Sequence, residues 1–75
     1  MASNITRDAH QSPILLRISE VRKLTGLSDS AIYRKAADGT FPRPLKISDR
    51  SSAWIESEVR IWIVTRIEAR NGGAI

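Results

Sequence analysis

Residues 18–39 read ISEVRKLTGLSDSAIYRKAADG, and two short helical patterns in this stretch meet at Gly26. The first pattern predicts a helix over residues 19–25, with the Ser19 hydroxyl as its N-cap and Gly26 as a left-handed C-cap. The second pattern predicts a helix over residues 29–38. A turn this short that contains a glycine is typical of a helix-turn-helix.

The second helix has clear signals at both ends. Ser28 can accept a hydrogen bond from a free amide of the first turn, and Asp29 favours the positive end of the helix dipole. Ile32 and Ala36 are four residues apart, so we expect them on the face turned to the core. Gly39 then ends the helix.

The segment that follows reads TFPRPLKISDRSSAW over residues 40–54. Its two prolines lack amide donors, so the segment begins as an extended loop. Alternating apolar and cationic residues predict a strand over residues 45–47, turn residues follow, and residues 51–54 can return as a second strand. A hairpin this small is marginally stable alone, so we expect apolar side chains to pack it on the helices. The side chains expected to do so are Leu45, Ile47 and Trp54.

Residues 55–70 read IESEVRIWIVTRIEAR and form the clearest helical pattern in the chain. We expect Trp62, like Trp54, to pack in the core rather than stack on bases. Ile61 and Val64 fall off the main apolar stripe, so the apolar arc is wider than one small core requires. The sequence leaves open that this helix docks on an integrase, an RNA polymerase subunit or a second copy of the chain.

These patterns together predict a mainly α fold with a small β-hairpin. The arrangement is a winged helix-turn-helix of three helices plus a two-stranded wing. We expect the domain over residues 15–70, between a flexible N-terminal arm at 1–14 and a flexible C-terminal tail at 71–75.

Length and composition exclude several classes of function. A chain of 75 residues makes one small core, and it contains no cysteine and a single histidine, His10. Thiolate chemistry, disulfides and cysteine zinc sites are therefore excluded, and no base stands near a nucleophile. We therefore expect that the protein is not an enzyme and that it holds no cofactor and no metal ion. Because no apolar run approaches the roughly 18 residues of a membrane span, we expect a soluble cytoplasmic protein.

The positive charge is concentrated in the middle of the chain. Residues 17–52 hold eight basic residues against four acids, which accounts for the whole net charge of +4. From residue 53 onward, three arginines balance three glutamates. We therefore expect the middle of the chain to contact a negatively charged partner, and double-stranded DNA is the partner that this charge favours.

The candidate DNA-binding residues lie on the second helix and on the hairpin. They are Ser28, Ser30, Tyr33, Arg34, Lys35, Arg43, Lys46 and Arg50. A helix-turn-helix places its second helix in the major groove, where Arg34 could bind a guanine edge or a phosphate. Three alternatives stay open: partial burial of Tyr33, an ordinary solvated face for Arg34 and Lys35, and wing charges that protect an edge strand from pairing.

Residues 15–70 closely resemble the AlpA family of phage- and prophage-type regulators, within the MerR-like winged-helix domains and excisionases. The residues that carry this resemblance are Leu16 with Arg17, Thr25 to Ser28, Ile32 to Arg34, Gly39 to Pro44 as GTFPRP, and Trp54 with Glu58, Val59 and Trp62. The resemblance implies a small transcription factor of a mobile element, or an excisionase that binds and bends attachment-site DNA. It also implies DNA contacts by Ser28, Ser30, Tyr33 and Arg34, and by Lys46 and Arg50 on the wing.

The chain departs from the family pattern at two places. Asp29 stands where a basic or neutral residue is common, and the wing turn from Ser48 to Arg50 lacks the usual glycine. A monomer with this surface would read only a short site, so we expect a homodimer or cooperative binding to repeated sites.

Overall fold

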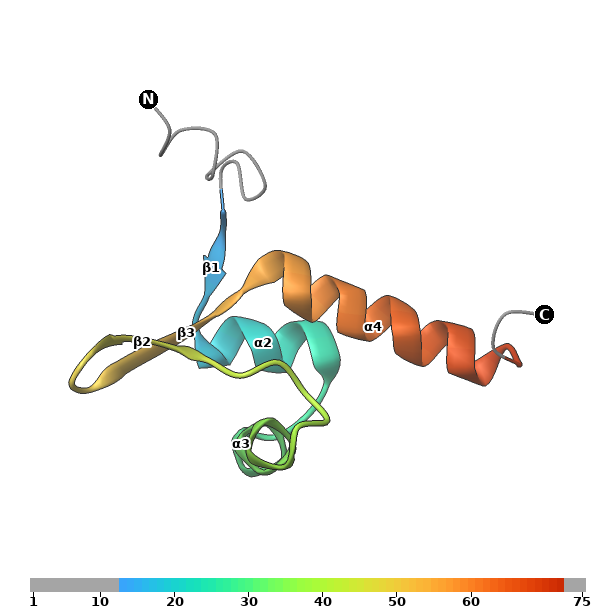
Figure 1. Cartoon of the computed structure of the whole chain (residues 1–75), viewed down its shortest axis with the longest axis horizontal. Coiled ribbons are helices and arrows are strands. Elements are labelled where there is room, and N and C mark those ends of the chain that lie inside the picture. The colour runs from blue at the N-terminus through green and yellow to red at the C-terminus, as the bar shows by residue number, and fades with distance from the viewer. Residues whose placement is uncertain (1–12, 73–75) are drawn as a thin grey trace.

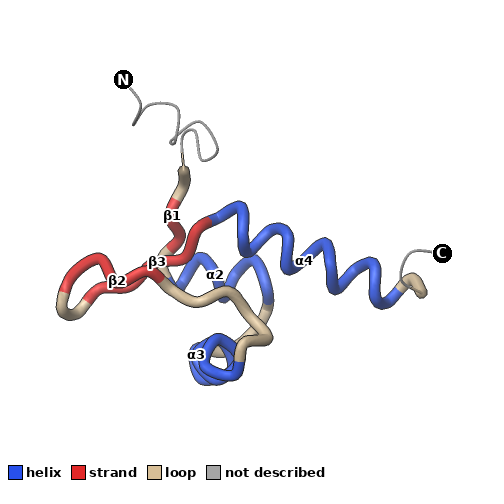
Figure 2. The backbone as a smooth tube through the Cα atoms, viewed as in Figure 1, coloured by secondary structure: helices blue, strands red, loops and turns tan. Residues whose placement is uncertain are grey.

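The computed structural model describes residues 13–72, and among them it contains three helices and three short strands (Figures 1 and 2). In chain order the elements are β1 (Leu15–Leu16), α2 (Ile18–Thr25), α3 (Asp29–Asp38), β2 (Leu45–Ser48), β3 (Ser51–Ile55) and α4 (Glu56–Arg70). The predicted winged helix-turn-helix is confirmed. The predicted arm at 1–14 and tail at 71–75 lie mostly outside the described residues, so those two boundaries stay predictions.

Helix α2 starts one residue earlier than predicted, and Ser19 is not its cap. Arg17 is the N-cap residue, and its backbone N–H donates to Oε1 of Glu20 at 2.9 Å. The carboxylate therefore anchors the residue before the helix, while Ser19 lies inside the first turn. The other end agrees with the prediction, because Gly26 has a φ of 76° in the left-handed region.

Helix α3 has the predicted bounds and the predicted caps. The Ser28 Oγ accepts a hydrogen bond from the Ala31 N–H at 3.2 Å, which satisfies one of the free amides of the first turn. Gly39 ends the helix with a φ of 87°. The turn that joins α2 to α3 is fixed by Thr25. The Thr25 hydroxyl donates to the Val21 carbonyl at 2.8 Å and accepts from the Leu27 N–H at 3.2 Å.

Replacing Ser28 with alanine is expected to lower the free energy of unfolding by about 1 kcal/mol, because one amide of α3 loses its acceptor. Urea unfolding followed by far-UV circular dichroism measures the change. Ser30→Ala is the control, since Ser30 is the second residue of the same helix and is exposed. Equal losses in the two variants would contradict the capping role.

The three strands form one antiparallel sheet in the order β1-β3-β2. Leu16 pairs with Trp54 on one side of β3, and Leu45 pairs with Ala53 on the other. An irregularity in register between Lys46 and Ser48 bends the outer part of the hairpin. The strand β1 was not predicted from the sequence, and it makes β3 the central strand.

The core lies where β3, α2, α3 and the start of α4 meet. Its cluster of buried side chains consists of Leu16, Val21, Ile32, Phe41, Trp54 and Val59. Trp54 is the largest side chain with no exposed surface, and its indole N–H donates to the Pro42 carbonyl at 2.9 Å. The predicted inward positions Ile32 and Ala36 are both buried.

Two of the three side chains expected to pack the hairpin on the helices do not do so. Leu45 is 45% exposed and Ile47 is 50% exposed, whereas Trp54 is fully buried. The reason is that the hairpin projects from the body of the domain, as Figure 2 shows, and only its inner end reaches the core. The hairpin is therefore held through β3 and not through β2.

Helix α4 is attached to the domain by its first half. Trp62 is half-buried against the core, as predicted, and its indole N–H donates to the Thr40 carbonyl at 2.7 Å. The Trp62 ring also meets Phe41 edge-on, with centroids 4.9 Å apart. Beyond this point α4 extends away from the other elements (Figure 1). Within residues 13–72, no helix is both long and apolar enough to span a bilayer.

Candidate nucleic-acid interface

The outer stripe of α3 is formed by Ser30 and Arg34. Each residue of an α-helix turns by about 100° around the axis, so side chains opposite Ile32 and Ala36 point away from the core. Ser30 and Arg34 lie four residues apart on that opposite side, and both are exposed. The structure therefore brings these two predicted residues together on one open surface.

Tyr33 lies at the edge of this stripe, on the side of the wing. Its ring packs against Trp54, with centroids 5.6 Å apart, yet the residue remains exposed. A shallow pocket beside it is also lined by Arg43 and Pro44. One part of the ring therefore packs, in agreement with the partial-burial alternative, while another part faces solvent, and contact of Tyr33 with DNA stays a prediction.

Lys35 does not join the outer stripe. It is half-buried and lines a groove between the end of α2 and α4, together with Leu24, Trp62 and Arg66. One residue along the helix is enough to rotate its side chain from the face of Arg34 to the face of α4. Of the two adjacent cations, only Arg34 faces outward with Ser30.

The two cations of the hairpin, Lys46 and Arg50, have different surroundings. The Lys46 Nζ donates to the Asp49 carbonyl at 3.2 Å, so this ammonium group stabilises the hairpin turn. Arg50 is exposed within the turn itself. Figure 1 shows the hairpin and α4 extending in opposite directions, with α3 seen end-on below α2. The wing therefore offers a second basic surface that is separate from α3.

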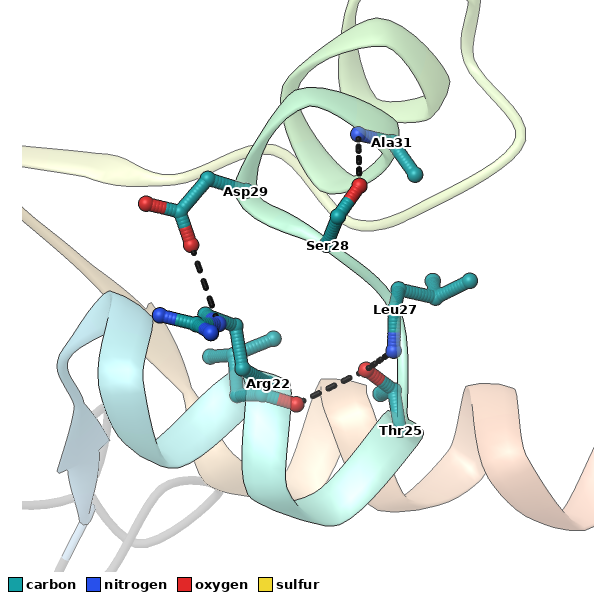
Figure 3. A network of polar contacts seen from close by, with 7 residues as sticks. Arg22, Thr25, Leu27, Ser28, Asp29 and Ala31 are labelled. Atoms are coloured by element: carbon teal, nitrogen blue, oxygen red, sulfur yellow. Dashed lines mark hydrogen bonds and ion pairs between the residues drawn. The ribbon is translucent and has the colours of Figure 1, made fainter.

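Sequence reasoning missed the ion pair between Arg22 and Asp29. The Arg22 Nε lies 3.3 Å from the Asp29 Oδ1 and links α2 to the first residue of α3 (Figure 3). This contact accounts for an acid near the expected DNA surface, because a guanidinium group lies directly against it. The sequence did contain a signal for this pair, because a cation and an acid lie seven residues apart on the two sides of the turn.

The carboxylate of Asp38 is held at the end of α3 by Thr40. The Thr40 hydroxyl donates to the Asp38 Oδ1 at 2.6 Å, and the Thr40 N–H donates to the same atom at 3.0 Å. These two hydrogen bonds lower the pKa of Asp38, and the charges of Lys35 and Arg34 lower it further. Protonation would therefore weaken the turn that follows α3.

Stability should consequently fall in acid, in part because of Asp38. Its pKa is depressed in the folded state, so its contribution is present above the unfolded pKa of about 3.9 and is lost as pH falls through the folded value. We expect Asp38→Asn to flatten the decrease of the urea midpoint between about pH 4 and pH 2. Parallel curves for the variant and the natural protein would contradict this assignment.

Among residues 13–72, no group of three or more His, Cys, Asp or Glu side chains could hold a metal ion. His10, the single histidine of the chain, lies outside the described residues. The geometry of the described part consists of an exposed stripe on a capped helix, a projecting basic hairpin and an ion pair that links α3 to α2.

Comparison with known proteins places this geometry in a family. The family described as prophage CP4-57 regulatory protein (AlpA) matches residues 14–67, which include every strand, α2, α3 and most of α4. The chain is also similar to the uncharacterized protein ORF88 of Enterobacteria phage P4, with 41% identity over 58 residues. That alignment covers 77% of this chain and 66% of the phage protein. The chain therefore belongs to the AlpA family of prophage regulatory proteins.

Proposed function

We propose that this phage-associated DNA-binding regulator reads the major groove of double-stranded DNA with α3. The observation that carries the proposal is the exposed stripe of Ser30 and Arg34, directly opposite the buried Ile32 and Ala36. An α-helix has the diameter that the major groove admits, and the second helix of this motif is the one that enters it.

Each side chain of this surface has a chemistry that suits DNA. The guanidinium group of Arg34 can donate two hydrogen bonds to the O6 and N7 atoms of guanine. The Ser30 hydroxyl can bond a base edge or a phosphate, and Tyr33 can meet a thymine methyl or donate its hydroxyl to the backbone. The Ser28 hydroxyl oxygen already accepts a hydrogen bond from the Ala31 N–H, so this hydroxyl would contact DNA as a donor.

The wing completes the proposed interface. Arg50 and Lys46 lie on the projecting hairpin, where they would neutralise phosphates or enter the adjacent minor groove. Arg43 lies between the two elements, beside Tyr33. Lys35 faces the groove beside α4, so in this proposal it adds positive charge to the surface and makes no base contact.

The first experiment is selection of binding sites from a pool of random DNA duplexes. Enrichment of one sequence supports sequence-specific reading, and affinity for the enriched site should fall steeply as salt concentration rises. Affinity that does not depend on salt would contradict binding through phosphates. Failure to enrich any sequence would contradict specific reading by α3.

Transcription control and excision would use the same surface, and we favour transcription control. A reporter gene placed beside the enriched site tests this choice directly. A change in reporter expression is expected when the protein is present. Bending of the attachment site, measured by gel mobility of permuted fragments, without any change in the reporter would instead identify an excision factor.

A second candidate function, self-association through α4, is favoured by the exposed apolar residues on its outer face. Ile61 is 66% exposed, and it shares a stripe with Ser57, Val64 and Glu68. Two antiparallel copies would place Ile61 against Val64 and let the Ser57 hydroxyl donate to Glu68. Sedimentation over a range of concentrations tests this arrangement. A monomer at every concentration would exclude it, and Ile61→Glu should abolish any dimer.

A further inference from the structure

The ion pair between Arg22 and Asp29 leaves part of the Arg22 side chain available to a ligand. The ion pair forms at the Nε atom of Arg22, and its terminal amino groups make no hydrogen bond within residues 13–72. These two groups carry four of the five N–H donors of a guanidinium group. Figure 3 shows Arg22 on α2 reaching across to Asp29 at the start of α3.

The pair contributes little to stability, and its effect is therefore mainly one of orientation. Both side chains are more than half exposed, at 56% and 53%. Exposed pairs of this kind typically stabilise a fold by about 0.2–1 kcal/mol. The carboxylate does, however, restrict where the long side chain of Arg22 can point.

Arg22 borders a shallow pocket on α2 whose other polar side chains suit a phosphate. The pocket is also lined by Ser19, Lys23 and Gly26. It thus offers one guanidinium group, one ammonium group and one hydroxyl. Asp29 offsets one of the two positive charges, and the remaining charge matches the single negative charge of a phosphodiester.

The position of the pocket is compatible with DNA on α3. Asp29 directly precedes Ser30, the first residue of the outer stripe. A helix about 10–12 Å wide fills a major groove about 12 Å wide, so side chains at its edges lie near the phosphates that border the groove. Arg22 is held at such an edge by its contact with Asp29.

We propose that the pocket formed by Ser19, Arg22 and Lys23 binds one phosphate of the DNA backbone, and that Asp29 positions Arg22 for this contact. The proposal rests on the proposed DNA-binding function. It assigns to α2 a binding site that is separate from α3 and the wing. It also gives Asp29 a favourable role at a surface where its charge alone would repel DNA.

The decisive variant is the double substitution Arg22→Ala with Asp29→Asn, which leaves the net charge unchanged. Its affinity for a short random-sequence duplex is expected to be about tenfold weaker, because one phosphate contact is lost. For the same reason, the slope of log affinity against log salt concentration should be smaller in magnitude by about one unit. Affinity equal to that of the natural protein would overturn the proposal, since Arg22 would then only neutralise Asp29. Circular dichroism checks that the variant is folded.

A matched control exists on α4. Arg60 and Glu56 form an ion pair at 3.2 Å, with the Arg60 side chain 58% exposed, close to the value for Arg22, and the Glu56 side chain 24% exposed. The double variant Arg60→Ala with Glu56→Gln therefore removes a pair with the same charges away from the proposed surface. It should bind DNA as the natural protein does. An equal loss in both double variants would overturn a specific role for Arg22.

The single variant Asp29→Asn tests whether Asp29 positions Arg22 for its contact with DNA. It removes a negative charge near DNA, so simple repulsion predicts tighter binding, whereas loss of positioning predicts binding about two- to threefold weaker. Tighter binding would overturn the role proposed for Asp29.

Two further arms separate this proposal from its alternatives. Inorganic phosphate, titrated without DNA at constant ionic strength, should leave the NMR amide signals of Ser19 to Lys23 unchanged, and DNA should shift them. Saturable shifts with phosphate alone would assign the pocket to a free anion and overturn the proposal. If the natural protein binds no duplex, the proposed function itself fails. If it binds and depends on Arg34 but not on Arg22, only this inference fails.

Discussion

Replacement of Trp54 with alanine is expected to remove much or all of the free energy of unfolding of the domain. Trp54 has no exposed surface, and truncating a buried tryptophan typically costs about 3–5 kcal/mol. A domain of this size has a total stability of roughly 4–11 kcal/mol at 25 °C. The substitution therefore removes much or all of it, and far-UV circular dichroism with a urea titration measures the loss.

Two control variants separate the contributions of Trp54. Trp54→Phe keeps an aromatic ring but loses the hydrogen bond to the Pro42 carbonyl, so we expect a smaller loss of about 1–3 kcal/mol. Trp62→Ala should also cost less than Trp54→Ala, because Trp62 is only half-buried. Equal stability of Trp54→Ala and the natural protein would contradict the central place of Trp54 in the core.

The second large effect is expected from Arg34→Ala. Loss of a forked contact to guanine should weaken binding to the selected duplex by about tenfold to hundredfold and reduce discrimination at one base pair. Fluorescence anisotropy with the selected duplex and with single-base variants of it measures both quantities. Stability should change little, because Arg34 is exposed.

Lys35→Ala is the matched control for this prediction. It removes the same charge one residue further along, but Lys35 faces the groove beside α4. We therefore expect a loss of affinity of only a few-fold, equal on all sequences. If the two variants lost the same affinity and kept the same base preference, α3 would act through charge alone and the proposed orientation would be wrong.

The helices could be predicted from the sequence because their signals are local. Ser28 and Gly39 cap α3, and the spacing of Ile32 and Ala36 identifies its inner face. The start of α2 was misplaced because the Glu20 carboxylate accepts from the Arg17 N–H, so that Arg17 is the N-cap residue and Ser19 lies inside the first turn. The strand β1 was missed because two residues are too few to show an alternating pattern.

The parts of the site that sequence could not predict depend on how elements meet. The apolar residues Leu45 and Ile47 alternate as in a packed strand, yet nothing local shows that β2 is an edge strand that projects from the body. The pairing of Arg22 with Asp29 likewise depends on the angle between α2 and α3. Distances across a turn follow from tertiary packing, which residue spacing alone does not specify.

Thr40 makes the end of α3 and the middle of α4 parts of one mechanical linkage. Its N–H donates to the Lys35 carbonyl at 2.9 Å, while its own carbonyl accepts from Trp62. A displacement of the second half of α4 can therefore be transmitted to the end of α3 through a single residue, so the far end of the long helix and α3 are mechanically coupled.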